Sequence, residues 1–335
     1  MDNADSTTGV GAAIAALAII TVALRFYARY KTRAGLRWDD WLILASLSFV
    51  IATDILVVYA NSVNPTGAER ASIASAVENS PADVVYTKIS FIATVLYFAI
   101  TASTKLSILL LYNRLFSVSA TFRRHIIILS GAVIGYWVGS TIADLLNCIP
   151  IKYTWINSLA DPRFCINYNI FWLATGVVEA FIDVLILLLP IEVVAKLQLS
   201  TKKKIAVCSV FIIGAFVIVS GLLKVIYGFV PGSRQPSFAR TSLWTTVHSG
   251  TGIICACLPV CWPILVGLGK FKQWAWVRSI KSSGHSFSGW SRLRASSAPK
   301  ENTTKYETPL DTSDRDKMIS LNRISSSPFN REFEV

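Results

Sequence analysis

Charged residues are scarce in this chain of 335 residues, where they make up 16% of the total. A soluble domain carries about 25%. Because 53% of the residues are hydrophobic, this composition argues against a soluble fold. Histidine is also rare, with three residues, and none is spaced with the six cysteines to complete a metal site. We therefore expect no bound metal.

Long apolar runs dominate what remains. A helix needs about 20 mostly apolar residues to cross the hydrocarbon core of a bilayer, whereas a transmembrane barrel shows alternating segments of about 10 residues. The sequence has seven long runs, and it predicts an all-α, polytopic membrane protein with a seven-transmembrane helix bundle. The predicted spans are Gly9–Ala28, Asp40–Ala60, Lys88–Tyr112, His125–Asn147, Asn169–Val193, Ile205–Tyr227 and Leu243–Leu268.

These spans divide the chain into an outer or lumenal tail (1–8), a seven-helix domain (9–269) and a C-terminal tail (270–335). Residues 279–335 are rich in serine and poor in apolar residues, so they cannot bury enough surface to fold alone. We expect a disordered cytosolic tail that is free to bind cytosolic partners. No basic segment precedes the first span, so we expect that span to act as its own insertion signal.

The net charge of +12 comes from basic residues beside the spans, so it does not indicate nucleic-acid binding. The more basic side of a membrane protein faces the cytosol, which predicts a cytosolic C-terminus and an outer or lumenal N-terminus. The plasma membrane and internal membranes fit equally well. The richer side carries Arg29, Lys31, Arg33, Arg37, Arg114, Arg123, Arg124, Lys196, Lys202, Lys203, Lys204, Lys270, Lys272, Arg278 and Lys281, and the other side Arg70, Lys152, Arg163, Arg234 and Arg240.

Ionisable residues inside spans are expensive in lipid and are usually functional. Glu179 and Asp183 share one helix face and would repel each other if both were ionised, so one should be protonated or have a basic partner. A structural ion pair and a cavity that binds a ligand or protons both fit this pattern. The candidate ligand-binding residues are Asp54, Lys105, Asp144, Glu179, Asp183, Lys224 and His248.

Asp54 and Asp144 lie nearer the outer ends of their spans, where water can reach them. His248 fits either a satisfied core histidine or a group that donates or titrates.

The second span opens with two aspartates, Asp39 and Asp40, at the predicted cytosolic face. Aspartate is favourable at a helix N-terminus, both as a cap and against the helix dipole. The alternative is a cytosolic ionic lock that pairs one of these aspartates with Arg29 or Arg114.

Two of the six cysteines, Cys148 and Cys165, share one predicted outer loop. Because that side is oxidising, we expect them to form a disulfide. The other four lie within spans, where cysteine packs as a small hydrophobic residue.

Several motifs together resemble the fungal rhodopsin-like integral membrane family, which includes the satratoxin-cluster membrane proteins. They cover residues 10–270. The resemblance implies seven helices and a role in secondary metabolism, for example in a mycotoxin pathway. The family also includes receptor-like proteins. The motifs are Arg25-Phe-Tyr-Ala-Arg29, Leu36-Arg-Trp-Asp39-Asp40-Trp41, Lys105-Leu-Ser-Ile-Leu-Leu-Leu-Tyr-Asn-Arg114, Cys148-Ile-Pro150 with Cys165, Asp183 with Leu189-Pro190, and Cys257-Leu258-Pro259.

The chain departs from this pattern at His248, where the family often has an acidic residue, and at Lys224, where it often has arginine. No retinal cofactor is expected, because the last span has no lysine between Arg240 and Lys270 to form a Schiff base.

Three functions remain open from the sequence. The first is a non-enzymatic membrane protein that handles or senses a lipophilic small molecule. The second is an integral membrane enzyme, such as a cyclase that uses Glu179 and Asp183 as general acids on a terpenoid or polyketide. The third is a metabolite transporter, which is disfavoured because no inverted repeat is visible.

Overall fold

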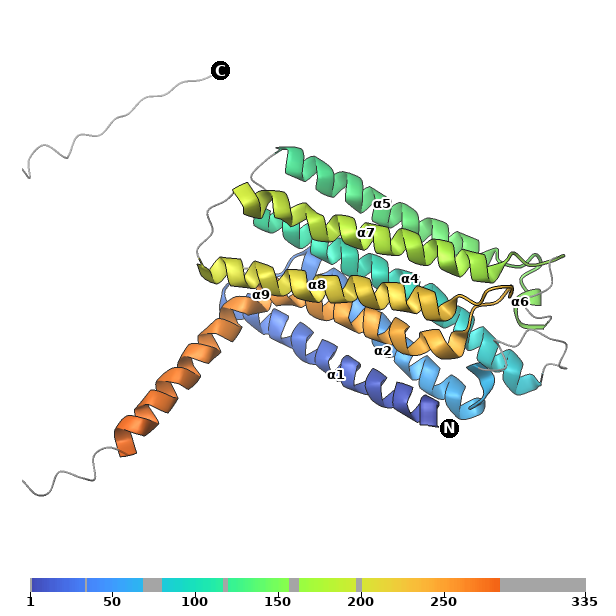
Figure 1. Cartoon of the computed structure of the whole chain (residues 1–335), viewed down its shortest axis with the longest axis horizontal. Helices are drawn as coiled ribbons and strands as arrows, with labels where there is room; N and C mark the ends of the chain where they lie inside the picture. The colour runs from blue at the N-terminus through green and yellow to red at the C-terminus, as the bar shows by residue number, and fades with distance from the viewer. Residues whose placement is uncertain are drawn as a thin grey trace, which may run out of the picture. The chain divides into compact units, whose positions relative to one another are not determined.

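The computed structural model describes residues 2–33, 35–68, 80–116, 120–156, 163–196 and 201–283, which form helices joined by short loops (Figure 1). Every helix except α6 is long and apolar enough to cross a membrane, which confirms the predicted seven-span, all-α fold. The helices are α1 (Asp2–Lys31), α2 (Trp38–Val63), α4 (Pro81–Phe116), α5 (Ala120–Leu145), α6 (Tyr153–Ile156), α7 (Tyr168–Lys196), α8 (Thr201–Gly228) and α9 (Phe238–Ser283).

All seven spanning helices extend beyond the predicted spans, and three of them do so by seven residues or more at one end. The first, α1, begins at Asp2, so most of the predicted outer tail is helical, and α4 begins seven residues before Lys88. The last, α9, continues to Ser283, because residues 270–283 contain neither proline nor glycine to end the helix. The remainder of the predicted cytosolic tail lies outside the described residues.

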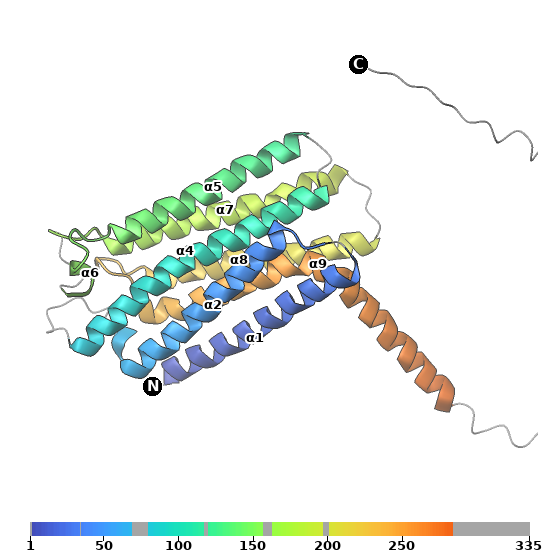
Figure 2. The ribbon, with the colours of Figure 1, turned by 180° about the vertical axis from the view of Figure 1, so that it is seen from behind.

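The chain divides into two units, residues 1–275 and 276–335. Within the first, α4 contacts α2, α5 and α7, and α7 also contacts α5 and α8 (Figures 1 and 2). One apolar cluster joins α1, α2, α4 and α9, and a second joins α4, α5 and α7. Because α4 belongs to both clusters, its polar side chains are well placed to be buried inside the bundle.

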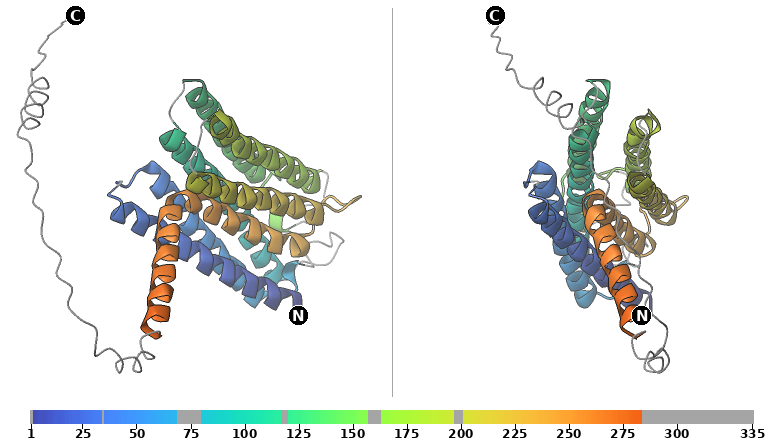
Figure 3. Two further views of the ribbon diagram at one scale, coloured as in Figure 1. Left: turned by 60° about the vertical axis from the view of Figure 1, so that its left-hand side comes forward. Right: turned by 90° about the vertical axis from the view of Figure 1, so that its left-hand side faces the viewer.

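Large apolar side chains also lie on the outer surface of the bundle. Ile55, Ile128, Phe181 and Ile212 each expose more than 60% of their surface, on four of the spanning helices visible in Figure 3. Glu179, by contrast, is almost fully buried. An apolar exterior that encloses a few buried ionisable groups is stable when the surroundings are lipid.

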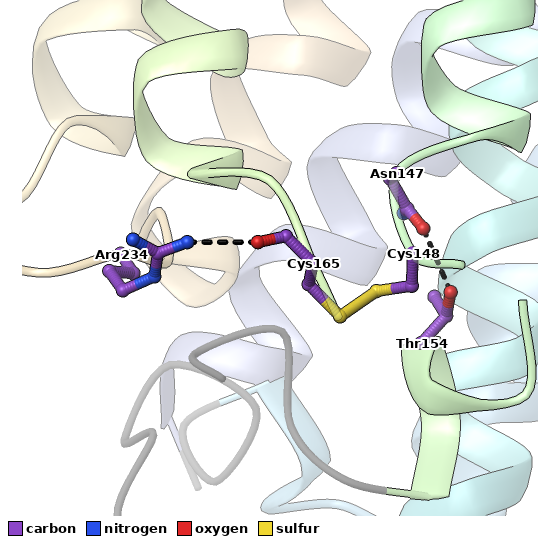
Figure 4. Close-up of a disulfide and its surroundings, with 5 residues drawn as sticks. All are labelled: Asn147, Cys148, Thr154, Cys165 and Arg234. Atoms are coloured by element: carbon purple, nitrogen blue, oxygen red, sulfur yellow. Dashed lines mark hydrogen bonds between the residues drawn. A yellow bond between two sulfur atoms is a disulfide. The ribbon is translucent and has the colours of Figure 1, made fainter. Parts of the chain in front are cut away.

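The connections at one end of the bundle form a bonded cap (Figure 4). A disulfide links Cys148 to Cys165, which confirms the predicted pair. Arg234, from the loop before α9, donates a hydrogen bond of 2.9 Å to the Cys165 carbonyl oxygen. Thr154 Oγ1 donates to Asn147 Oδ1 at 2.8 Å. The disulfide and the Thr154 bond hold the α5–α7 connection together, and the Arg234 bond ties it to the α8–α9 connection.

Candidate functional site

Five ionisable side chains from four helices meet inside the bundle. Lys105 comes from α4, Glu179 and Asp183 from α7, Lys224 from α8 and His248 from α9. All five belong to the set predicted to bind ligand. We call this group the central ion cluster.

Glu179 is the hub of the central ion cluster. Its Oε2 atom accepts a hydrogen bond from Lys224 Nζ at 2.8 Å, and its Oε1 atom lies 3.5 Å from Lys105 Nζ. Lys105 Nζ also donates to Asp183 Oδ1 at 2.6 Å. Each acid thus faces an ammonium group, which offsets the cost of holding ions away from water.

Two further side chains complete the bonding of Glu179. Tyr97 Oη donates to Glu179 Oε2 at 2.7 Å and accepts from Lys224 Nζ at 2.6 Å. His248 Nε2 lies 3.3 Å from Glu179 Oε1, and its Nδ1 lies 3.1 Å from the Val217 carbonyl oxygen. Ser220 Oγ also lies 3.4 Å from Nδ1, so the imidazole faces two acceptors and one hydroxyl group, and both ring nitrogens have a partner.

Local geometry explains why these side chains converge. Glu179 and Asp183 are one helical turn apart, so α7 presents both carboxylates to its neighbours. On α8, the position opposite His248 is Gly221. A Cβ atom added there would meet the imidazole Cε1 at 3.1 Å, so glycine allows the ring to approach the α8 backbone.

A cavity opens beside the cluster, between α4, α7, α8 and α9. Lys105, Asp183 and His248 line one part of it, and the remaining lining is mostly apolar. Its volume is about 60 Å³, which is small beside the ~300–1,000 Å³ of typical ligand pockets. The cavity therefore suits a compact group, such as part of a larger molecule. Its apolar lining includes Ile108, Ile186, Leu187, Val210 and Val217.

A metal ion fits this arrangement poorly. Glu179, Asp183 and His248 bring three ligand atoms within 4.8 Å of one another, which is a spacing that a metal could use. Lys105 and Lys224, however, place ammonium groups against the same carboxylates. Their positive charge repels a cation, so the site is poorly suited to bind a metal ion.

Two predicted ligand residues lie elsewhere. Neither Asp54 nor Asp144 lines the cavity. The expectation that Asp144 is hydrated is wrong, because its side chain is fully buried and accepts a hydrogen bond of 2.8 Å from Tyr168 Oη. Tyr168 begins α7 and covers the end of α5, a contact that span boundaries do not reveal.

A second buried network lies at the start of α2. Asp39 Oδ2 is 2.7 Å from both Arg25 Nη2 and Arg29 Nη2. Asp40 Oδ1 is 2.8 Å from Arg25 Nε and 3.2 Å from Arg29 Nε. Arg114, the other predicted partner, lies in the last turn of α4. These contacts match the predicted pairing with Arg29, and its action as a lock stays a proposal.

Sequence reasoning missed two members of these networks. Arg25 is fully buried and also donates to the Ala256 carbonyl oxygen at 2.7 Å. A cation inside a span, one turn before Arg29, was the available signal. The sequence offers no way to identify Tyr97, because a single tyrosine in an apolar span cannot be distinguished from an aromatic residue that only packs.

Comparisons with known proteins fit this architecture. The fungal rhodopsin domain matches residues 24–267. "Wortmanamides biosynthesis cluster protein C" of Talaromyces wortmannii is 29% identical, over 87% of this chain and 77% of its own length. "Satratoxin biosynthesis SC1 cluster protein 4" of Stachybotrys chartarum is 26% identical, over 60% of this chain and 72% of its own.

"Receptor GIN3" of Arthrobotrys oligospora is also similar, at 26% identity over 72% of this chain and 57% of its own length. No solved structure matches the chain.

Proposed function

Because the chain belongs to the fungal rhodopsin domain family, matched over residues 24–267, we propose that it binds a lipophilic small molecule within the membrane. The binding site is the cavity between α4, α7, α8 and α9. In this proposal the protein is not an enzyme, and it senses or handles a metabolite of a fungal biosynthetic pathway.

One observation carries the proposal: the central ion cluster forms part of the wall of an otherwise mostly apolar cavity. Ions held in a bundle cost free energy, and a purely structural pair gains nothing from an adjacent opening. Lys105 and Asp183 place charge, and His248 places a polar ring, where a bound molecule would meet them. The names of the relatives support a role in metabolite biosynthesis or in sensing, since two of the three refer to biosynthesis clusters and one to a receptor.

The cyclase alternative receives less support. A general acid must carry a proton in the resting state. Asp183 and Glu179 instead accept hydrogen bonds from lysine ammonium groups at 2.6 and 2.8 Å. Such bonds stabilise the ionised carboxylate, so these residues are poor proton donors in this arrangement.

Orientation is part of the same proposal. The excess of basic residues on one side favours a cytosolic C-terminus. The disulfide-linked cap then lies on the opposite, oxidising side. We also propose that no retinal is bound, since α9 offers no lysine between Arg240 and Lys270.

Deletion of the gene in its native host, followed by metabolite and transcript profiling, tests this function. Sensing predicts changed transcription of biosynthetic genes without accumulation of one intermediate. Accumulation of a single precursor would instead favour the enzyme. Retention of finished product inside the cell would favour the transporter.

A further inference from the structure

The central ion cluster leaves one of its acceptor atoms unused. Asp183 Oδ1 receives Lys105 Nζ, but Asp183 Oδ2 is buried and accepts no hydrogen bond from the described residues. The side chain is 11% exposed and lines the cavity. A buried acceptor without a donor costs free energy, and the cost is larger for a charged group.

Three hydroxyl groups that also line the cavity have hydrogen-bond partners other than Asp183. Thr101 Oγ1 donates to the Phe98 carbonyl oxygen at 3.1 Å, and Ser249 Oγ donates to the Thr245 carbonyl oxygen at 2.9 Å. Thr104 Oγ1 pairs with Ser46 Oγ at 2.6 Å, facing α2. Because Asp183 lines the cavity, a molecule bound there can supply a donor for Asp183 Oδ2.

Each of the two acids in the central ion cluster already has a lysine partner. Lys105 lies against Asp183, and Lys224 against Glu179. The missing partner must supply a hydrogen bond but need not supply charge. The apolar lining next to Asp183, which includes Ile186 and Leu187, favours a hydrocarbon body behind the donor group.

We propose that the cavity recognises a neutral, lipophilic molecule through a hydroxyl or amide N–H that donates to Asp183 Oδ2. The inference rests on the proposed function and deepens it, because it assigns the polar group of the ligand. Molecules whose polar atoms only accept hydrogen bonds, such as ethers, should bind less tightly. Asp183 would then set ligand specificity.

A pair of isomers provides the test. 1-Butanol and diethyl ether have the same composition, but only the alcohol donates a hydrogen bond. We would measure both dissociation constants by ligand-observed NMR with the full chain in lipid nanodiscs, subtracting partitioning into empty nanodiscs. The wild-type protein should bind 1-butanol about tenfold more tightly than diethyl ether.

Two variants separate specificity from binding itself. In Asp183→Asn, Lys105 can bond the amide oxygen, which leaves the NH₂ group facing the cavity and should bring the two probes within about threefold of each other. Asp54→Asn is the matched control, because Asp54 does not line the cavity, and it should keep the wild-type preference.

Gly252→Ala tests the cavity without touching charge. The added Cβ would meet Thr104 Cγ2 at 3.6 Å, an ordinary contact, so the fold should tolerate it while the cavity shrinks. Both probes should weaken by a similar factor.

Three results would overturn the inference. Equal wild-type affinities, with both weakened by Gly252→Ala, would reject the donor requirement but leave the proposed function standing. Binding that Gly252→Ala leaves unchanged, or no binding of either probe, would reject both. If Asp183→Asn fails to fold, two measurements still test the inference: the preference of the wild-type protein for 1-butanol and the affinity of Gly252→Ala for both probes.

Discussion

Lys105 Nζ lies 2.6 Å from Asp183 Oδ1, although the two residues are 78 positions apart in the sequence. The contact joins α4 to α7, and the same ammonium group lies 3.5 Å from Glu179 Oε1. Among the described residues, Lys105 therefore has two acidic partners, whereas Asp183 has one basic partner. The consequences of a substitution depend on which charge is left without a partner.

Asp183→Asn should separate function from folding. Lys105 keeps Glu179 as a partner in this variant, so the protein should reach the membrane at a normal level. It should nevertheless fail to restore metabolite output in a deletion strain, because the cavity loses its carboxylate. Immunoblotting of membrane fractions and metabolite profiling measure the two effects, with Asp54→Asn as the control. Full output at normal expression would reject a role for Asp183.

Glu179→Gln should damage the fold itself. This substitution leaves Lys224 without an acidic partner and Lys105 with Asp183 alone, so the free energy of unfolding should fall by about 3–5 kcal/mol. Thermal unfolding in detergent would measure the loss. Adding Lys224→Met removes the unpaired cation and should recover part of it. A double variant no more stable than Glu179→Gln would argue against this pairing.

The arginines on α1 should contribute unequally. Arg25 is fully buried and bonds Asp39, Asp40 and the α9 backbone, whereas Arg29 is 7% exposed and bonds the two aspartates. We expect Arg25→Gln to cost about 3–5 kcal/mol of unfolding free energy and Arg29→Gln to cost less. Detergent melting curves of the two variants test this order, and equal losses would contradict it.

Removal of the disulfide should loosen the cap. Cys148 and Cys165 are separated by 17 positions, and closing a loop of that size typically stabilises a fold by roughly 3 kcal/mol. The variant with both cysteines changed to serine should melt at a lower temperature. Mass mapping of the wild-type protein without reductant should find the two linked, and recovery of both as alkylated free thiols would disprove the bond.

A reporter for glycosylation tests the orientation. Fused after Val335, it should remain unglycosylated, because the charge bias places that end in the cytosol. A glycosylation site engineered into the connection between α5 and α7 should be used instead. The reverse pattern would invert the proposed topology.

The sequence alone determined the fold class and the positions of the spans. A chain in hydrocarbon must satisfy its backbone hydrogen bonds within itself, so seven long apolar runs allow little other than seven helices. The same cost of burying charge marked Lys105, Glu179, Asp183 and Lys224 as unusual before any contact was known. The cysteine pair followed from loop position.

The sequence did not determine which charges meet. The spacing of Glu179 and Asp183 defines their shared face of α7, but it leaves open which neighbouring helix supplies each cation. Arg25 and Tyr97 were missed for the same reason, since each gains its meaning from residues on other helices. The position of Asp144 near the end of its span predicted hydration, but the tertiary structure places the Tyr168 hydroxyl against its carboxylate.

Only the tertiary structure decided these points, and the reason is physical. An apolar run predicts a helix in lipid, because each apolar side chain is stabilised by the lipid environment whatever its neighbours are. A buried ion gains from one or two specific atoms a few ångströms away, and helix packing brings those atoms together from distant parts of the chain. The unused Oδ2 atom of Asp183 is a property of that packing, and no sequence pattern contains it.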